Sequence, residues 1–179
     1  MLKSKILFQL TGSIACYKAC DGISKLVQRG HEVRVVATAN ALQFVGAATL
    51  EGLTGHPVFS DVFERGRMMD HIELAKWAQI AVVCPASANT INQLAAGVAA
   101  NCVGSIFLAF DLQKPYLIFP AMNQEMYKHP ATQKSLATLE SYGVRVFSTG
   151  VGHQACGDVG PGRLLESEQI VESIEGCAK

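Results

Sequence analysis

Charge is scarce in this sequence. Charged residues fill 17% of its 179 positions, whereas hydrophobic residues fill 49%. Lysine plus arginine equals aspartate plus glutamate at 15 each, so no basic excess indicates binding to nucleic acid or to an anionic membrane. A chain with so little charge and a mean hydropathy of +0.22 often buries apolar surface against further copies of itself. We therefore expect a homo-oligomer.

Long apolar runs and paired cysteines are also absent. No run approaches the roughly 20 residues that cross a membrane, and the first predicted strand is not preceded by the apolar region of a signal peptide. The six cysteines include no CxxC pair and are too sparse for a disulfide scaffold. We expect a cytoplasmic protein without membrane contact. Cys16 and Cys20 share a helix face, but nothing nearby supplies further ligands, so no metal site is predicted.

Strand and helix patterns alternate along the chain. Short apolar runs predict strands at 5–10, 32–38, 80–83, 114–119 and 144–147. Helical patterns separate them, among them 71–77, 98–110, 131–142 and 167–175. The alternation predicts right-handed βαβ units and one α/β domain over residues 1–179. Its sheet should be open and parallel, in a three-layer Rossmann or flavodoxin-like arrangement with helices on both faces.

Glycine and proline interrupt this alternation. The stretch 49–69 is expected to be irregular, with turns or short strands and a mobile connection. The stretch 150–163 holds five glycines and a proline, which predicts no regular element. Pro85 is expected to end the third strand because it cannot donate to the ladder. The expected helix caps are Ser13, Asp70, Ser167 and the group Ser87, Asn89 and Thr90.

Polar loops follow the predicted strands. Ligands of open parallel sheets bind beyond the carboxyl ends of the strands, where the strand order reverses. Gly12 permits a sharp turn there, and free N–H groups of the following helix can face an anion. The turn is neither GxGxxG nor a Walker loop, which need more glycines. The loops expected to converge at this edge are Gly12–Ser13, Thr38, Ser87–Thr90 and Ala121–Asn123.

Short motifs spread over nearly the whole chain carry a resemblance. They are Gly12-Ser-Ile-Ala-Cys-Tyr-Lys18, His71-Ile-Glu-Leu74 with Trp77, Pro85-Ala-Ser-Ala-Asn-Thr90, Pro120-Ala-Met-Asn123 with Met126, and Ala155-Cys-Gly-Asp-Val-Gly-Pro-Gly-Arg163. In these motifs and their order the chain resembles the homo-oligomeric flavin-containing cysteine decarboxylases. It departs from the family at Gln79, where an acid is common, and at Tyr127, where tryptophan is frequent.

The resemblance implies FMN as cofactor and a homo-oligomer, a trimer or a dodecamer of trimers, with the flavin between subunits. The implied FMN contacts are Gly12, Ser13, Ile14, Thr38, Phe44, Ser87, Ala88, Asn89, Thr90 and Ala121.

The resemblance also implies a reaction. The cysteine moiety of 4′-phosphopantothenoylcysteine, a small molecule, would be oxidatively decarboxylated to 4′-phosphopantetheine in coenzyme A biosynthesis. Loss of carbon dioxide leaves electrons on the α carbon, and oxidation of the adjacent CH2–S⁻ to a thioaldehyde creates a group that accepts them. FMN takes the two electrons of this oxidation as a hydride. The reduced FMN later returns the hydride to the enethiolate while an acid returns a proton, which gives the saturated thiol.

Individual residues match the family's working parts. His71 is the implied base or polariser, and Cys156 the implied proton donor of the second half-reaction. Asn123 is the implied contact of the substrate carboxylate, with Met122, Ala155 and Gly157 beside the substrate. The glycine-rich loop resembles a clamp that excludes water. Candidate ligands of the substrate phosphate are Arg163, Lys76 and Arg67, although a residue of this kind is more often a solvated surface charge.

Other functions remain open from the sequence. Relatives that decarboxylate the C-terminal cysteine of a peptide tend to lack the cysteine-containing clamp, so Cys156 favours the small substrate. His71 and the Pro-Ala-Met-Asn motif disfavour a flavin-prenylating enzyme. Non-catalytic flavin-binding regulators carry long acidic tails, which this chain lacks. A plain Rossmann-type binder without flavin would not account for Asn123 or Cys156.

Overall fold

A five-stranded parallel sheet forms the centre of the computed structural model, which describes residues 3–153 and 157–177. Its strand order is β2–β1–β3–β4–β5, which is the order of flavodoxin-like folds. The chain leaves β1 toward one edge and enters β3 on its other side, so the strand order reverses between β1 and β3. The strands are β1 (Lys5–Leu10), β2 (Glu32–Ala37), β3 (Ile80–Ala86), β4 (Tyr116–Pro120) and β5 (Arg145–Val146).

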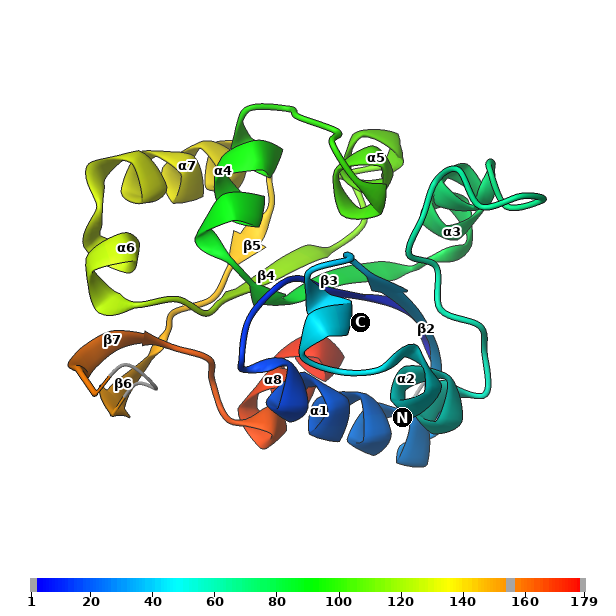
Figure 1. The fold of residues 1–179 in the computed structure, drawn as a ribbon, viewed down its shortest axis with the longest axis horizontal. Coiled ribbons are helices and arrows are strands. Elements are labelled where there is room, and N and C mark those ends of the chain that lie inside the picture. Colours follow the sequence, from blue (N-terminus) through cyan, green and yellow to red (C-terminus); the bar gives the residue numbers. More distant parts are fainter. Residues whose placement is uncertain (1–2, 154–156, 178–179) are drawn as a thin grey trace.

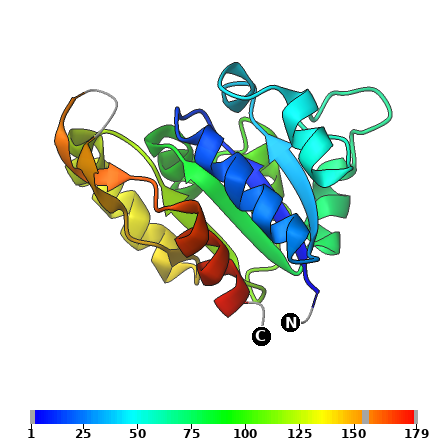
Figure 2. The same ribbon diagram turned by 90° about the horizontal axis from the view of Figure 1, so that it is seen from below.

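Helices cover both faces of this sheet (Figures 1 and 2). One layer holds α1 (Cys16–Gln28), α2 (Ala47–Thr54) and α8 (Ser167–Gly176). The opposite layer holds α3 (Asp70–Trp77), α4 (Ala88–Ala95), α5 (Cys102–Ala109) and α7 (Pro130–Ser141). Alternate strand residues supply the two cores: Ile6 and Phe8 face the first layer, and Leu7 faces the second. The three-layer fold is therefore confirmed.

The third strand continues past Pro85, contrary to expectation. All seven residues of β3 are buried, and its pairing with β4 shifts register between Val83 and Ala86. A proline at such an irregularity removes no ladder hydrogen bond that the sheet needs. The strand thus reaches Ala86 and delivers Ser87 directly to the sheet edge.

The stretch 49–69 is predicted to be irregular, with turns or short strands, but it contains most of helix α2 (Ala47–Thr54). The prediction was wrong because it took the glycines as signs of irregular structure. Gly55, at φ +71°, instead ends the helix as its left-handed cap, and Gly52 lies inside the helix. Residues 150–163 were likewise expected to be irregular. They contain β6 (Gly150–His153) and β7 (Val159–Arg163), which pair antiparallel as a hairpin.

Helix ends differ from the sequence predictions in several places. Helix α5 starts at Cys102 rather than at Val98, because Asn101 accepts hydrogen bonds from the N–H groups of Val103 and Gly104. The five-residue helix α6 (Gln124–Lys128) and the 3-10 turn η1 (Ala41–Gln43) complete the elements of the described residues. Within those residues no helix is long and apolar enough to span a membrane.

Only one of the expected caps occupies its predicted place. Ser87 caps α4 by accepting a hydrogen bond from the Thr90 N–H at 3.3 Å. Ser13 lies before the N-cap of α1, which is Ala15, and its hydroxyl accepts from the Ala15 N–H. Met69 and Glu166 occupy the other N-cap positions in place of Asp70 and Ser167, and Glu166 forms a reciprocal capping box with Gln169.

Candidate functional site

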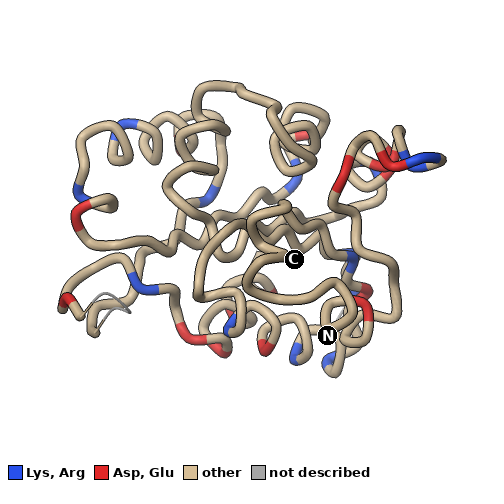
Figure 3. The backbone as a smooth tube through the Cα atoms, viewed as in Figure 1, with Lys and Arg blue, Asp and Glu red and all other residues tan. Residues whose placement is uncertain are grey.

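The loops that follow β1 to β4 enclose a cavity of about 340 Å³, here called the cradle. It lies beyond the carboxyl ends of the strands, where the strand order reverses, as predicted. The loops after β1 and β3 carry no charged residue (Figure 3). The cradle is lined by Gly12, Ser13, Thr38, Asn40, Ser87, Ala88, Asn89, Thr90, Asn101, Ala121, Met122 and Met126.

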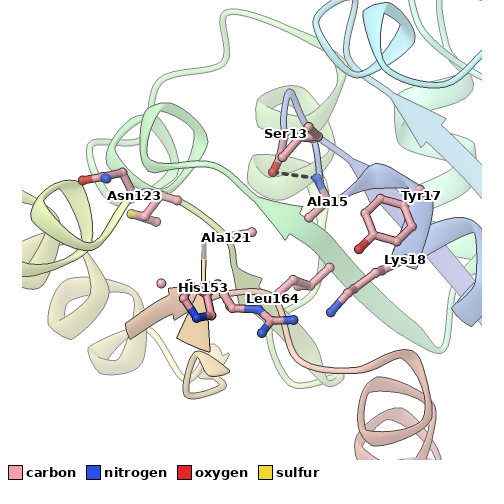
Figure 4. A pocket seen from close by; sticks show the side chains of 12 residues that line it. Ser13, Ala15, Tyr17, Lys18, Ala121, Asn123, His153 and Leu164 are labelled. Atoms are coloured by element: carbon pink, nitrogen blue, oxygen red, sulfur yellow. Dashed lines mark hydrogen bonds between the residues drawn. The ribbon is translucent and has the colours of Figure 1, made fainter. Parts of the chain in front are cut away.

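A second cavity of about 560 Å³ is here called the outer cavity (Figure 4). It shares Ser13, Ala121 and Met122 with the cradle. Apolar side chains form much of its wall, and the start of α1 and strand β7 close its sides. It is lined by Ser13, Ile14, Ala15, Tyr17, Lys18, Ala121, Met122, Asn123, His153, Gly162, Arg163 and Leu164.

Hydrogen bonds through Thr11 join the first and third loops. Its hydroxyl donates to the carbonyl of Pro85 at 2.7 Å and accepts from the Ser87 N–H at 2.9 Å. Ser87 also lies 3.2 Å from the Thr90 hydroxyl. The first N–H groups of α4 have no partner within the helix and carry its positive dipole end. The cradle therefore offers fixed donors to an anion without any basic side chain.

Close backbone packing shapes the cradle at Gly12. A Cβ atom on this residue would lie 2.7 Å from Cβ of Asn40, well inside van der Waals contact. Only glycine therefore leaves the loops after β1 and β2 in this arrangement. A polar cradle beside a larger, mostly apolar cavity fits a group with a phosphate-bearing polar chain and a flat ring, which is the shape of a flavin nucleotide.

Asn123 links β4 to the hairpin β6–β7. Its side chain caps α6 by accepting from the Glu125 N–H at 2.8 Å, and its amide nitrogen donates to the Asp158 carboxylate at 2.8 Å. Next to it, the Met122 N–H donates to the Gly162 carbonyl at 2.9 Å. These contacts hold β7 against the end of β4, so the hairpin forms one wall of the outer cavity.

His71 lies apart from these cavities. It belongs to the first turn of α3, at the other end of the molecule from the hairpin (Figure 1). It lines neither the cradle nor the outer cavity, and its buried Nδ1 has no hydrogen-bond partner among the described residues. One chain therefore does not bring His71 to Asn123.

The remaining predicted residues divide into three groups. Phe44 is 51% exposed and lies outside both cavities, as does the exposed Gly157. Ala155 and Cys156 lie outside the described residues. Every other predicted cofactor or substrate contact lines the cradle or the outer cavity, with Ile14 in the latter.

The three candidate phosphate ligands lie in different parts of the structure. Arg163 lines the outer cavity, whereas Arg67 lines a different one beside α3 and donates to Asp70 at 2.7 Å. Lys76 lines none of the three cavities.

Several lining residues escaped the sequence prediction. Asn40 and Asn101 line the cradle, and Tyr17, Lys18 and His153 line the outer cavity. A signal was available for Lys18, because it ends the Gly12–Lys18 motif. Asn40 follows β2 by three positions, so its place at the same sheet edge could also have been inferred.

Burial makes the thiols of Cys16 and Cys84 unreactive. Burial raises the pKa of Cys16 to about 11 and that of Cys84 well above its usual range. The Cys16 thiol donates to the Thr11 carbonyl at 3.4 Å. Both stay protonated near neutral pH and serve as packing groups. No group of three or more histidine, cysteine or acidic side chains in the described part of the chain could hold a metal ion.

Comparison with known proteins identifies the family of the chain. The family described as Flavoprotein matches residues 1–179. The chain is 42% identical over 173 residues to the coenzyme A biosynthesis bifunctional protein CoaBC of Vibrio vulnificus, covering 96% of this chain but only 43% of that protein. It is 41% identical over 176 residues to a probable phosphopantothenoylcysteine decarboxylase of Streptococcus mutans, covering 97% of this chain and 98% of the relative.

A solved structure shares the fold over nearly its whole length. It is a cysteine-to-serine mutant of PPC decarboxylase complexed with pantothenoylaminoethenethiol, with a TM-score of 0.85 and 29% identity over 97% of both chains.

Proposed function

Because the chain belongs to the Flavoprotein family, we propose that it binds FMN and decarboxylates the cysteine moiety of 4′-phosphopantothenoylcysteine to give 4′-phosphopantetheine in coenzyme A biosynthesis. The observation that carries the proposal is the pairing of an uncharged cradle at the strand ends with an outer cavity that contains Asn123. The relative of similar length in Streptococcus mutans is named for this activity, which supports the substrate.

The cradle residues would hold the cofactor. Ser87, Thr90 and the first N–H groups of α4 suit the phosphate of FMN, and Ile14, Ala121 and Met122 suit its ring. When bound, FMN supplies an acceptor for the two electrons that leave the cysteine side chain. The hydrogen bonds of Thr11 keep the loops in place before the cofactor arrives, which reduces the entropy lost on binding.

Asn123 would orient the substrate. Its neutral amide can donate to a carboxylate without the strong ground-state stabilisation that a cation would add. A carboxylate that is held loosely can still leave as carbon dioxide. Asp158 accepts from the same amide nitrogen, so substrate binding would exchange one carboxylate acceptor for another.

His71 would act across a subunit boundary. The hydrophobic side chains before α3 are exposed, at 83% for Phe63, 62% for Met68 and 60% for Met69. Such a cluster favours burial against another protein surface. A second copy docked there would bring His71 to its neighbour's substrate, where an imidazole can take or hold a proton. The resemblance to homo-oligomers with flavin between subunits supports this arrangement.

Cys156, which lies in the sequence between β6 and β7, would return a proton in the second half-reaction. The hairpin would also exclude water and so protect the oxidised substrate from hydrolysis.

Purification and mixing tests address these assignments separately. The purified protein should be yellow and release FMN on denaturation, whereas a colourless protein that fails to bind added FMN would refute the cofactor. Inactive His71→Asn and Asn123→Ala proteins should regain activity when dissociated and reassembled together, because some mixed interfaces then have both residues intact. If mixing restores nothing although mixed oligomers form, His71 does not act across subunits.

A further inference from the structure

Two basic side chains meet at one end of the outer cavity. Lys18 is the third residue of α1 and Arg163 is the last residue of β7, so elements from opposite ends of the sequence supply them. Lys18 Nζ lies 2.7 Å from Glu166 Oε1, and Arg163 Nη2 lies 3.4 Å from the same oxygen. One carboxylate therefore bridges two cations, and the group keeps one positive charge in excess.

The surroundings hold both cations in place. The Lys18 side chain is only 12% exposed, and Glu166 is fixed by its capping box with Gln169. Arg163 packs over Gly152 of the neighbouring strand, where a Cβ atom would lie 2.7 Å from its Nη1. The absence of a side chain at Gly152 thus makes room for the guanidinium.

Asn123 occupies the opposite end of the cavity from Lys18 (Figure 4). The proposed substrate is also anionic at both ends, with the cysteine carboxylate at one and the phosphate monoester at the other. A phosphate carries between one and two negative charges near neutral pH and prefers arginine and lysine as partners.

We infer that Lys18 and Arg163 form the subsite that binds the phosphate monoester of the substrate, with Glu166 positioning both. The inference rests on the proposed function for its ligand. It adds Lys18 to the site and selects Arg163 over Arg67 and Lys76. Arg67 is already engaged by Asp70, Glu64 and the Val58 carbonyl. The subsite also separates this substrate from a peptide ending in cysteine, which has no phosphate to offer.

The test compares phosphorylated and dephosphorylated ligands. Binding of 4′-phosphopantetheine and of pantetheine to the FMN-loaded protein is measured by calorimetry, and kcat/KM is measured for phosphopantothenoylcysteine and pantothenoylcysteine. Lys18→Gln and Arg163→Gln should each lower the affinity and the kcat/KM for the phosphorylated ligands by about 10-fold or more, which is the loss expected for a charged hydrogen bond. The same values for the dephosphorylated ligands should change by less than about 2-fold.

Matched variants separate charge from folding. Lys18→Arg and Arg163→Lys should retain most of the preference for phosphate. Lys25→Gln removes another ion-paired lysine of α1 that lines none of the three cavities, and should leave the preference unchanged. The FMN affinity of each variant is measured too, because FMN also carries a phosphate monoester.

Each other outcome overturns one specific claim. Equal losses for both ligand forms, or no loss for either, refute the subsite. Weaker FMN binding with unchanged preference for phosphorylated ligands would assign the cations to the cofactor instead. A wild type that binds phosphopantetheine more tightly than pantetheine yet releases no carbon dioxide would refute the proposed function and keep the subsite.

Discussion

The cradle and the hairpin β6–β7 face the same ligand space but are built differently. Each cradle loop leaves a strand whose last residues are buried in the central sheet, and Thr11 ties the first loop to the third. In the described residues the hairpin strands pair only with each other, and bonds such as that from the Met122 N–H to the Gly162 carbonyl connect the hairpin to the end of β4. An isolated two-stranded hairpin is marginally stable in water.

This difference suggests a division of labour. A preformed cradle suits a cofactor that stays bound through every turnover. A hairpin that lies outside the central sheet suits a wall that must admit substrate and release product. Changes in the cradle should therefore affect FMN retention first, and changes in the hairpin should affect turnover while FMN remains.

The largest effect is expected for a change at Cys156, between β6 and β7 in the sequence. Cys156→Ser should lower formation of the final thiol by more than about 100-fold, because general acid catalysis typically contributes that much. FMN should stay bound. The decarboxylated product should accumulate in its oxidised enethiol form, short of two hydrogen atoms, and mass spectrometry distinguishes the two products. A variant that makes the saturated thiol at the wild-type rate would refute the donor role.

The cradle counterpart is Gly12→Ala. The added Cβ would collide with Asn40, and overpacking of this kind costs about 1–3 kcal/mol, so FMN affinity should fall about 10- to 100-fold. Fluorescence titration of the apoprotein with FMN measures the loss. Gly46→Ala is the matched control, since nothing lies within 4 Å of its added Cβ. Equal affinities in the two variants would contradict a close-packed cradle.

Asn123 tests the junction between the two regions. Asn123→Asp keeps a good cap for α6 but sets a second carboxylate beside Asp158 and the substrate carboxylate. We expect kcat/KM to fall at least about 10-fold with FMN retained, since a hydrogen bond to a charged group is lost. Asn123→Ser also keeps a cap but adds no charge, so it should be less impaired. The account of Asn123 fails if the aspartate variant turns over normally.

The smallest effect is expected for Ser87→Ala. Loss of this N-cap should lower the free energy of unfolding by about 1 kcal/mol, measured by urea denaturation of the apoprotein. FMN should bind more weakly as well, because the hydroxyl lines the cradle. Ser173→Ala on α8, away from both cavities, should change stability by less than about 0.5 kcal/mol and leave FMN binding unchanged. If Ser87→Ala lowers stability but leaves FMN binding unchanged, Ser87 is a helix cap with no role in binding.

The same contrast governs what the sequence could predict. Buried parallel strands are visible in a sequence as apolar runs. The sheet, and the residues at its edge such as Gly12 and Ser87, could therefore be predicted from the hydrophobic pattern alone. The hairpin could not, because Gly152, Gly160 and Pro161 are poor strand formers. They are accommodated by local geometry: Gly152 makes room for Arg163, and Gly160 lies against Gln124.

Two features of the site depend on tertiary structure and could not be read from local patterns. Lys18 and Arg163 are far apart in the sequence and meet only because β7 returns to the start of α1. The position of His71, on a helix remote from the outer cavity, emerges only when α3 is placed against α5 and β1. The sequence identifies candidate residues, and the packing of the elements around the sheet decides which of them line the same cavity.

One measurement tests the central claim most directly. The FMN-loaded protein is incubated separately with 4′-phosphopantothenoylcysteine and with a peptide ending in cysteine, and the products are followed by mass spectrometry. The account predicts loss of carbon dioxide from the phosphorylated small molecule to give the saturated thiol, with little reaction of the peptide. Decarboxylation of the peptide to an enethiol, with the small molecule unchanged, would contradict it.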